Sequence, residues 1–159
     1  MNTTPPLTAN QRIYQAALKH LGIAEKPGRT NNALVAQWIK EAATWLLDDG
    51  ADDSTVAWCG CFRGHLGNET MTGAPPAYYR AANWIHWGSF VNPSKTKAWL
   101  KGDTLIFKRS GGYHVTLFAD FINCAPGRVN CLGGNQSDKV CIASLELKNL
   151  IGVRRAQDL

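Results

Sequence analysis

The sequence lacks the features that mark membrane proteins and secreted precursors. No apolar run approaches the roughly 20 residues that a membrane-spanning helix requires. The N-terminal stretch MNTTPP contains neither a basic segment nor an apolar one, so it does not resemble a secretory signal. We therefore expect a protein that is synthesised in the cytoplasm without a signal peptide and is not inserted in a membrane.

The sequence also lacks clustered positive charge. Its 17 Lys and Arg residues outnumber its 12 Asp and Glu residues, which gives a net charge of +5. No five basic residues occur in a row, which argues against nucleic acid as a partner. The excess positive charge has two open interpretations, general solubility and attraction to an anionic polymer or surface.

The sequence also lacks the even number of cysteines that a complete set of disulfides would need. The chain has five, and an odd number without an export signal argues against a complete disulfide framework. Most of these thiols are expected to be small hydrophobic residues of the core. They are Cys59, Cys61, Cys124, Cys131 and Cys141.

A chain of 159 residues favours one domain, residues 1–159, with a loose lead-in over residues 1–7. A capping box predicts a helix over residues 9–21. A second helix, with an apolar stripe of period 3.6, is predicted to begin near Thr30 or Asn31. The first half of the chain therefore has helical periodicity.

The second half of the chain changes to strand periodicity. Residues 113–121 alternate between apolar and mixed positions, which is typical of a β-strand. Gly133-Gly134-Asn135 is expected to form a turn between two further strands. Helices followed by hairpin-linked strands indicate an α+β fold with N-terminal helices packed on an antiparallel sheet. The further strands are predicted over residues 104–108, 128–132, 139–143 and 150–154.

Cys59 is the first candidate for chemistry, because a third helix is predicted to start at or beside it. A thiol at a helix N-terminus feels the positive end of the helix dipole, which favours the nucleophilic thiolate. Cys61 points elsewhere on the helix, so the two thiols cannot share a role. Gly60 and Gly64 indicate close backbone packing or room for a ligand. A buried core thiol is the alternative interpretation of Cys59.

His114 and Asn135 are the candidate partners of Cys59. His114 follows two glycines on the less apolar face of its strand, where there is space beside the ring. Asn135 is suited to accept a hydrogen bond from the imidazole and so to fix its tautomer. Taken singly, the two have ordinary explanations, a satisfied histidine and a turn asparagine. The order Cys, His, Asn is nevertheless that of a nucleophile, a base and an orienting residue.

Four stretches of the sequence resemble the CHAP-type amidases, a group within the broader NlpC/P60-like peptidoglycan peptidases. The most specific are WCGCF at residues 58–62 and LGGNQSD at residues 132–138. The others are EKPG with NN within residues 25–32, and KGDTLIF followed by YHV within residues 101–115. The similarity keeps its order over most of the chain, and it is closest to a set of small phage and bacterial proteins.

The resemblance implies a papain-like fold in which Cys59 is the nucleophile, His114 is the base and Asn135 orients the base. It also implies hydrolysis of a peptidoglycan amide bond, in the stem peptide or between muramic acid and L-alanine, without a metal or other cofactor. The backbone N–H of Cys59 would bind the oxyanion, helped by a side chain such as Asp53 or Ser54.

A substrate groove is expected around the nucleophile. Tyr113 stands where the family often has glycine, and it would narrow the groove. Core packing is the alternative for at least one of the tryptophans assigned to it. The residues assigned to this groove are Trp58, Trp84, Trp87, Tyr113 and Gln136.

The sequence therefore predicts a monomeric peptidoglycan hydrolase with no separate wall-binding domain. The resemblance suggests a phage endolysin that is made in the host cytoplasm, depends on a holin for export and acts in the periplasm at the cell wall. An antibacterial secreted effector amidase with the same catalytic residues remains open. So does a non-catalytic module that binds the wall or a metal, the metal ligands then being Cys59, Cys61, His65 and His86.

Overall fold

The computed structural model describes residues 3–26, 31–47 and 56–158. Within these ranges the chain has the predicted α+β architecture, with one six-stranded antiparallel sheet. In chain order the elements are α1 (Ala9–Leu18), α2 (Ala33–Ala42), the 3-10 helix η1 (Thr44–Leu47), α3 (Cys59–Glu69), η2 (Ala81–His86), β1 (Ser89–Val91), η3 (Thr96–Ala98), β2 (Thr104–Arg109), β3 (Gly112–Phe121), β4 (Arg128–Gln136), β5 (Lys139–Glu146), η4 (Leu147–Asn149) and β6 (Leu150–Arg155).

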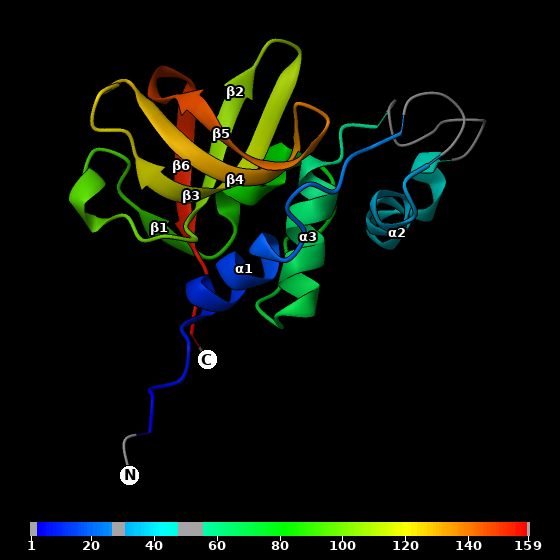
Figure 1. Ribbon diagram of the computed structural model, residues 1–159, viewed down its shortest axis with the longest axis horizontal. Helices are drawn as coiled ribbons and strands as arrows, with labels where there is room; N and C mark the ends of the chain where they lie inside the picture. The colour runs from blue at the N-terminus through cyan, green and yellow to red at the C-terminus, as the bar shows by residue number, and fades with distance from the viewer. Residues whose placement is uncertain (1–2, 27–30, 48–55, 159) are drawn as a thin grey trace.

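The sheet has the strand order β1-β6-β2-β3-β4-β5. Helices α1 and α3 contact each other and the sheet, whereas α2 packs on α3 and lies farther out, as Figure 1 shows. No helix of the described part of the chain is long and apolar enough to cross a membrane.

The capping box predicted for α1 is confirmed. The side chain of Thr8 accepts a hydrogen bond from the backbone N–H of Gln11, and the Gln11 side chain accepts one from the backbone N–H of Thr8. The helix ends at Leu18, before the expected end at residue 21, and Gly22 follows in the left-handed region with a φ of 89°.

Helix α2 is capped by Asn32, one residue after the predicted start. The Asn32 side chain accepts hydrogen bonds from the backbone N–H groups of Leu34 and Val35. The alternative cap, Thr30, lies outside the described residues. The predicted apolar stripe is buried through Ile39, but Ala42 at the helix end is only half-buried and Trp45 beyond it is more than half exposed.

Helix α3 starts at Cys59 as predicted, and its glycines allow close packing. A Cβ placed on Gly60 would lie 2.5 Å from the carbonyl oxygen of Tyr78, and one on Gly64 would overlap the Tyr78 ring. The segment containing Tyr78 therefore lies directly against the helix backbone. Of the two possibilities that these glycines suggested, close packing is the one that the structure supports.

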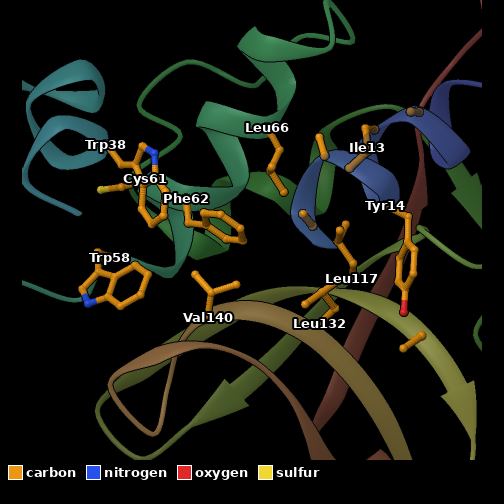
Figure 2. Close-up of a cluster of buried hydrophobic side chains, with 14 of the residues drawn as sticks. Ile13, Tyr14, Trp38, Trp58, Cys61, Phe62, Leu66, Leu117, Leu132 and Val140 are labelled. Carbon is orange, nitrogen blue, oxygen red and sulfur yellow. The ribbon is translucent and has the colours of Figure 1, made fainter. Parts of the chain in front are cut away.

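The hydrophobic core lies on both faces of the sheet. Figure 2 shows the larger cluster, in which side chains of α1, α2 and α3 meet Leu117, Leu132 and Val140 from the sheet. Alternate residues of the strands, such as Phe118 and Cys131, belong to a second cluster on the other face. A third cluster fills the space between the start of α3, η2 and strands β2 and β3.

The expected turn at Gly133-Gly134-Asn135 is wrong, because these residues form the end of β4. The hairpin turn is Ser137-Asp138, where both residues have positive φ angles of 50° and 63°. The glycines are required by packing instead: a Cβ on Gly134 would lie 2.7 Å from the Trp58 ring.

Replacing Gly64 with Ala tests the close packing of α3. We expect Gly64→Ala to lower the free energy of unfolding by about 1–3 kcal/mol, because Tyr78 must move to make room. This cost opposes a gain in helix propensity of about 1 kcal/mol. Denaturant unfolding followed by circular dichroism measures the difference.

The matched control is Gly127→Ala, because a Cβ on Gly127 meets no atom within 4 Å. We expect this variant to change the unfolding free energy by less than about 0.5 kcal/mol. A Gly64→Ala protein as stable as the wild type would contradict the packing argument.

Candidate active site

Cys59 is the first residue of α3 and is almost completely buried, with 3% of its surface exposed. The preceding residue anchors the helix start, since the indole Nε1 of Trp58 donates a hydrogen bond of 2.7 Å to the Glu25 carboxylate. Cys59 forms part of the wall of a surface pocket. The other lining residues are Ala57, Tyr79, Arg80, Ala81, Ala82, Arg109, Ser110, Gly111, Gly112 and Tyr113.

Burial raises the pKa of the Cys59 thiol above its ordinary value. The backbone N–H of Val115, the positive charge of Arg109 and the N–H groups at the start of α3 act in the opposite direction, but they do not outweigh burial. The resting form of Cys59 at neutral pH is therefore the thiol. The expected effect of the helix N-terminus, which favours the thiolate, is present, but burial outweighs it.

His114 lies near the start of β3 and is fully buried. Its Nε2 lies 2.9 Å from Oε1 of Gln136. Burial lowers the pKa of His114 to about 4, assisted by the positive charge of Arg109 and opposed by the hydrogen bond to Gln136. The imidazole is therefore neutral at pH 7, and its Nδ1 is buried without a hydrogen-bond partner among the described residues.

The side-chain amide of Gln136 uses its full hydrogen-bonding capacity. Its NH₂ group donates to the carbonyl oxygens of Cys131 and Cys141, at 3.0 and 2.7 Å. Its Oε1 accepts from His114 and from the Thr116 hydroxyl, both at 2.9 Å. Two carbonyl partners fix which end of the amide is the oxygen, so the imidazole must donate through Nε2–H. Its Nδ1 then carries the lone pair.

Gln136 thus occupies the position expected for Asn135, and this part of the prediction is corrected. In a regular strand, Asn135 would share a face with Gly133. The pairing of β4 with β5 shifts between Gly133 and Gln136, and Asn135 has a φ of 55°. This bulge moves the alternation by one residue, so that Gln136 faces His114. On the sequence alone, Gln136 is assigned to the substrate groove and not to His114. Its contact with His114 could not be predicted, because a strand bulge leaves no reliable signal in a sequence.

The structure brings Cys59 to the start of β3. Cys59 packs in one cluster with Val115. Because neighbouring residues of a strand face opposite sides of the sheet, this contact does not bring the His114 side chain to Cys59, and Nδ1 of His114 has no hydrogen-bond partner among the described residues. The register of β3 with β4 begins at Leu117. Arg109 at the end of β2 is close enough to influence both Cys59 and His114. Sequence reasoning missed Arg109, because a basic residue before a turn is commonplace.

The other predicted groove residues divide into three groups. Tyr113 is 44% exposed and lines the same pocket as Cys59. Trp58 and Trp84 are fully buried, so they do not line a groove. Trp87 lines a separate hollow with Pro75, Pro76 and His86. Asp53 and Ser54 lie outside the described residues.

The ligand set considered for a metal-binding module does not come together. Among the described residues, Cys59, Cys61, His65 and His86 are not close enough to share an ion. Cys61 points into the large core cluster on the other side of α3, and burial raises its pKa to about 12. Figure 2 shows Cys61 beside Trp38 and Phe62. Cys61 is therefore a core thiol.

No protein-family model matches the chain, and no curated protein matches it. The case for a function therefore rests on the residues of the site and on the sequence resemblance described above.

The buried neutral state of His114 predicts a dependence of stability on pH. Because its pKa falls from about 6.5 when unfolded to about 4 when folded, the unfolded chain takes up the proton first as pH falls. Above about pH 6.5, His114 is neutral in both states and does not reduce the free energy of unfolding. As the pH falls to about 4, protonation of His114 in the unfolded chain lowers that free energy by on the order of 3 kcal/mol. Urea unfolding at a series of pH values measures it.

We expect His114→Gln to flatten this dependence, because an amide does not titrate. His86→Gln removes an exposed histidine and serves as the control that keeps the wild-type slope. Equal slopes for wild type and His114→Gln between pH 7 and 4 would contradict the neutral buried state.

Proposed function

We propose that the protein is a cysteine hydrolase that cleaves an amide bond of peptidoglycan. The observation that carries the proposal is the position of Cys59, at the first residue of α3 and in the wall of a pocket that Arg109 and Tyr113 also line. The His114 ring is held by Gln136 and has an unpaired Nδ1. A nucleophile at the start of a helix packed on an antiparallel sheet fits a papain-like architecture. The peptidoglycan substrate rests on the sequence resemblance.

The reaction starts from a neutral pair. As the Cys59 sulfur attacks the substrate carbonyl carbon, Nδ1 of His114 accepts the thiol proton. This step requires the sulfur and Nδ1 to approach hydrogen-bonding distance when substrate binds. The backbone N–H of Cys59 is the candidate donor to the oxyanion. His114 then passes the proton to the leaving amine, and water hydrolyses the resulting thioester.

Gln136 acts as the orienting residue in this mechanism. Its Oε1 holds the proton on Nε2 of His114, which keeps Nδ1 available as the base. The same hydrogen bond stabilises the imidazolium that forms during attack, since it raises the pKa of His114. Thr116 and the two carbonyl partners of Gln136 keep the amide from turning.

The pocket suits a peptide that carries carboxylates. Its wall combines small residues such as Ala57 and Ala81 with the two cations Arg80 and Arg109. Arginine recognises carboxylates in a planar, two-pronged geometry. Stem peptides of peptidoglycan are short and anionic, so the pocket chemistry agrees with this substrate class.

The biological setting that we propose is lysis of a bacterial host by a phage. In this setting the enzyme is made in the host cytoplasm and needs a holin to reach the wall. A secreted antibacterial amidase would use the same residues.

Substitution of the two neighbouring cysteines tests the central assignment. We expect Cys59→Ala to reduce hydrolysis of purified peptidoglycan by more than about 1,000-fold, since no other group replaces the nucleophile. Release of new amino groups measures the rate, and mass spectrometry of the fragments identifies the bond that is cut.

Cys61→Ala is the matched control, because Cys61 lies on the same helix but points into the core. It is expected to retain activity per folded molecule, at a modest cost in stability. Full lytic activity of Cys59→Ala would refute the mechanism.

The charge of Arg109 is expected to appear in the pH profile of catalysis. His114 must be neutral to act as a base, so kcat/KM should rise with pH through an acid limb near the pKa of about 4. Arg109→Gln removes a positive charge that disfavours the imidazolium, so the pKa of His114 should rise. The acid limb of kcat/KM in this variant should therefore move to higher pH.

Arg80→Gln is the control for Arg109, because both residues line the same pocket. We expect this variant to raise KM without moving the acid limb. An unchanged acid limb in Arg109→Gln would show that its charge does not act on the base.

A further inference from the structure

We propose that a divalent transition-metal ion, with zinc as the best match, binds between the end of α1 and the second half of α3. The ligands are His20, His65 and Glu69. Among the described residues, this is the group of His, Cys, Asp and Glu side chains whose donor atoms lie close enough together to hold an ion. The site is separate from the candidate active site, because His65 lies about 9 Å along the helix axis from Cys59.

The distances suit a small metal ion. Nε2 of His20 and Nε2 of His65 both lie 3.5 Å from the same carboxylate oxygen of Glu69, and all three donor atoms lie within 4.8 Å of one another. Ligands of a tetrahedral zinc ion, with bonds of about 2.0–2.1 Å, are about 3.3 Å apart. Two of the three separations are therefore close to the required value. A small turn of the His20 ring would bring the third into range.

Glu41 on α2 prepares His65 to bind a metal. Its Oε2 lies 2.9 Å from Nδ1 of His65, and its Oε1 accepts a hydrogen bond of 2.7 Å from the Asn68 side chain. A carboxylate beside Nδ1 keeps the proton on that nitrogen, so the lone pair is on Nε2, which faces Glu69. A carboxylate–histidine–metal arrangement of this kind is usual around zinc.

His20 is the second observation that points to a ligand. Its Nε2 is buried and has no hydrogen-bond partner among the described residues. The ring is held edge-on against Trp38, Phe62 and His65, at centroid distances between 5.2 and 5.9 Å. The polar contact of this nitrogen is the Glu69 carboxylate oxygen at 3.5 Å, without a hydrogen bond. A buried nitrogen without a hydrogen bond is costly, and coordination to a metal would satisfy it.

The donor set selects the kind of metal. Two imidazoles and one carboxylate suit zinc and its neighbours cobalt, nickel and copper, whereas calcium and magnesium prefer oxygen donors alone. Three protein ligands leave one coordination position for water. His20 comes from the turn after α1, His65 and Glu69 come from the second half of α3, and Glu41 adds α2. We therefore assign the ion a structural role in joining the three helices.

Zinc binding to tag-free protein, stripped of metal with a chelator and kept reduced, tests this inference. Isothermal titration with zinc chloride should give one equivalent bound, and the Tm should rise with zinc. Cobalt chloride should give the intense visible bands of a four- or five-coordinate ion. Absence of binding, or no change in Tm at saturating zinc, would overturn the inference.

Variants locate the ion. His65→Gln and Glu69→Gln should each abolish the cobalt bands, and Glu41→Gln should weaken zinc binding by about 10- to 100-fold. His86→Gln, outside the cluster, is the control and should bind like the wild type. Binding that persists in His65→Gln and Glu69→Gln would place zinc elsewhere and overturn the assignment. Circular dichroism confirms that each variant is folded before titration.

Discussion

The candidate site depends on the hydrogen bonds of the Gln136 side-chain amide, which uses its full hydrogen-bonding capacity. It lies at the end of β4, donates to carbonyls of β4 and β5, and accepts from His114 and Thr116 on β3. A buried polar group that is fully satisfied is rigid, and one that is half satisfied is costly. Loss of any partner of Gln136 would therefore leave a buried polar group without a hydrogen bond. Because this is costly, the three strands hold the Gln136 amide in one orientation, and the amide in turn holds the His114 imidazole in one tautomer.

The start of α3 is held from the other side by close packing and by a buried arginine. Gly60 allows the carbonyls of Tyr78 and Tyr79 to approach the helix. Arg63, whose pKa is lowered to about 9 by burial, lies 4.5 Å from the Trp84 ring centroid and donates to the Thr104 hydroxyl. Helix α3, η2 and β2 are thus joined around the pocket, so that Cys59 is fixed in place by its surroundings.

Burial, more than the helix dipole, determines the electrostatics of the site. It raises the pKa of Cys59 and lowers that of His114, so the two groups rest as a neutral thiol and a neutral imidazole. Arg109 favours the thiolate and disfavours the imidazolium. An activated cysteine in this protein would therefore form during the reaction, by proton transfer, instead of standing ready as a thiolate.

The sequence by itself determined the features that depend on neighbouring residues: the Thr8 capping box, the start of α3 at Cys59, strand β3 and the α+β class. Only the tertiary structure decided that Gln136 and not Asn135 meets His114, because a bulge in β4 reverses the alternation there. It also decided that Gly134 serves packing and not a turn. Periodicity and capping are local, whereas burial, strand register and the contacts of a pocket arise from residues distant in the chain.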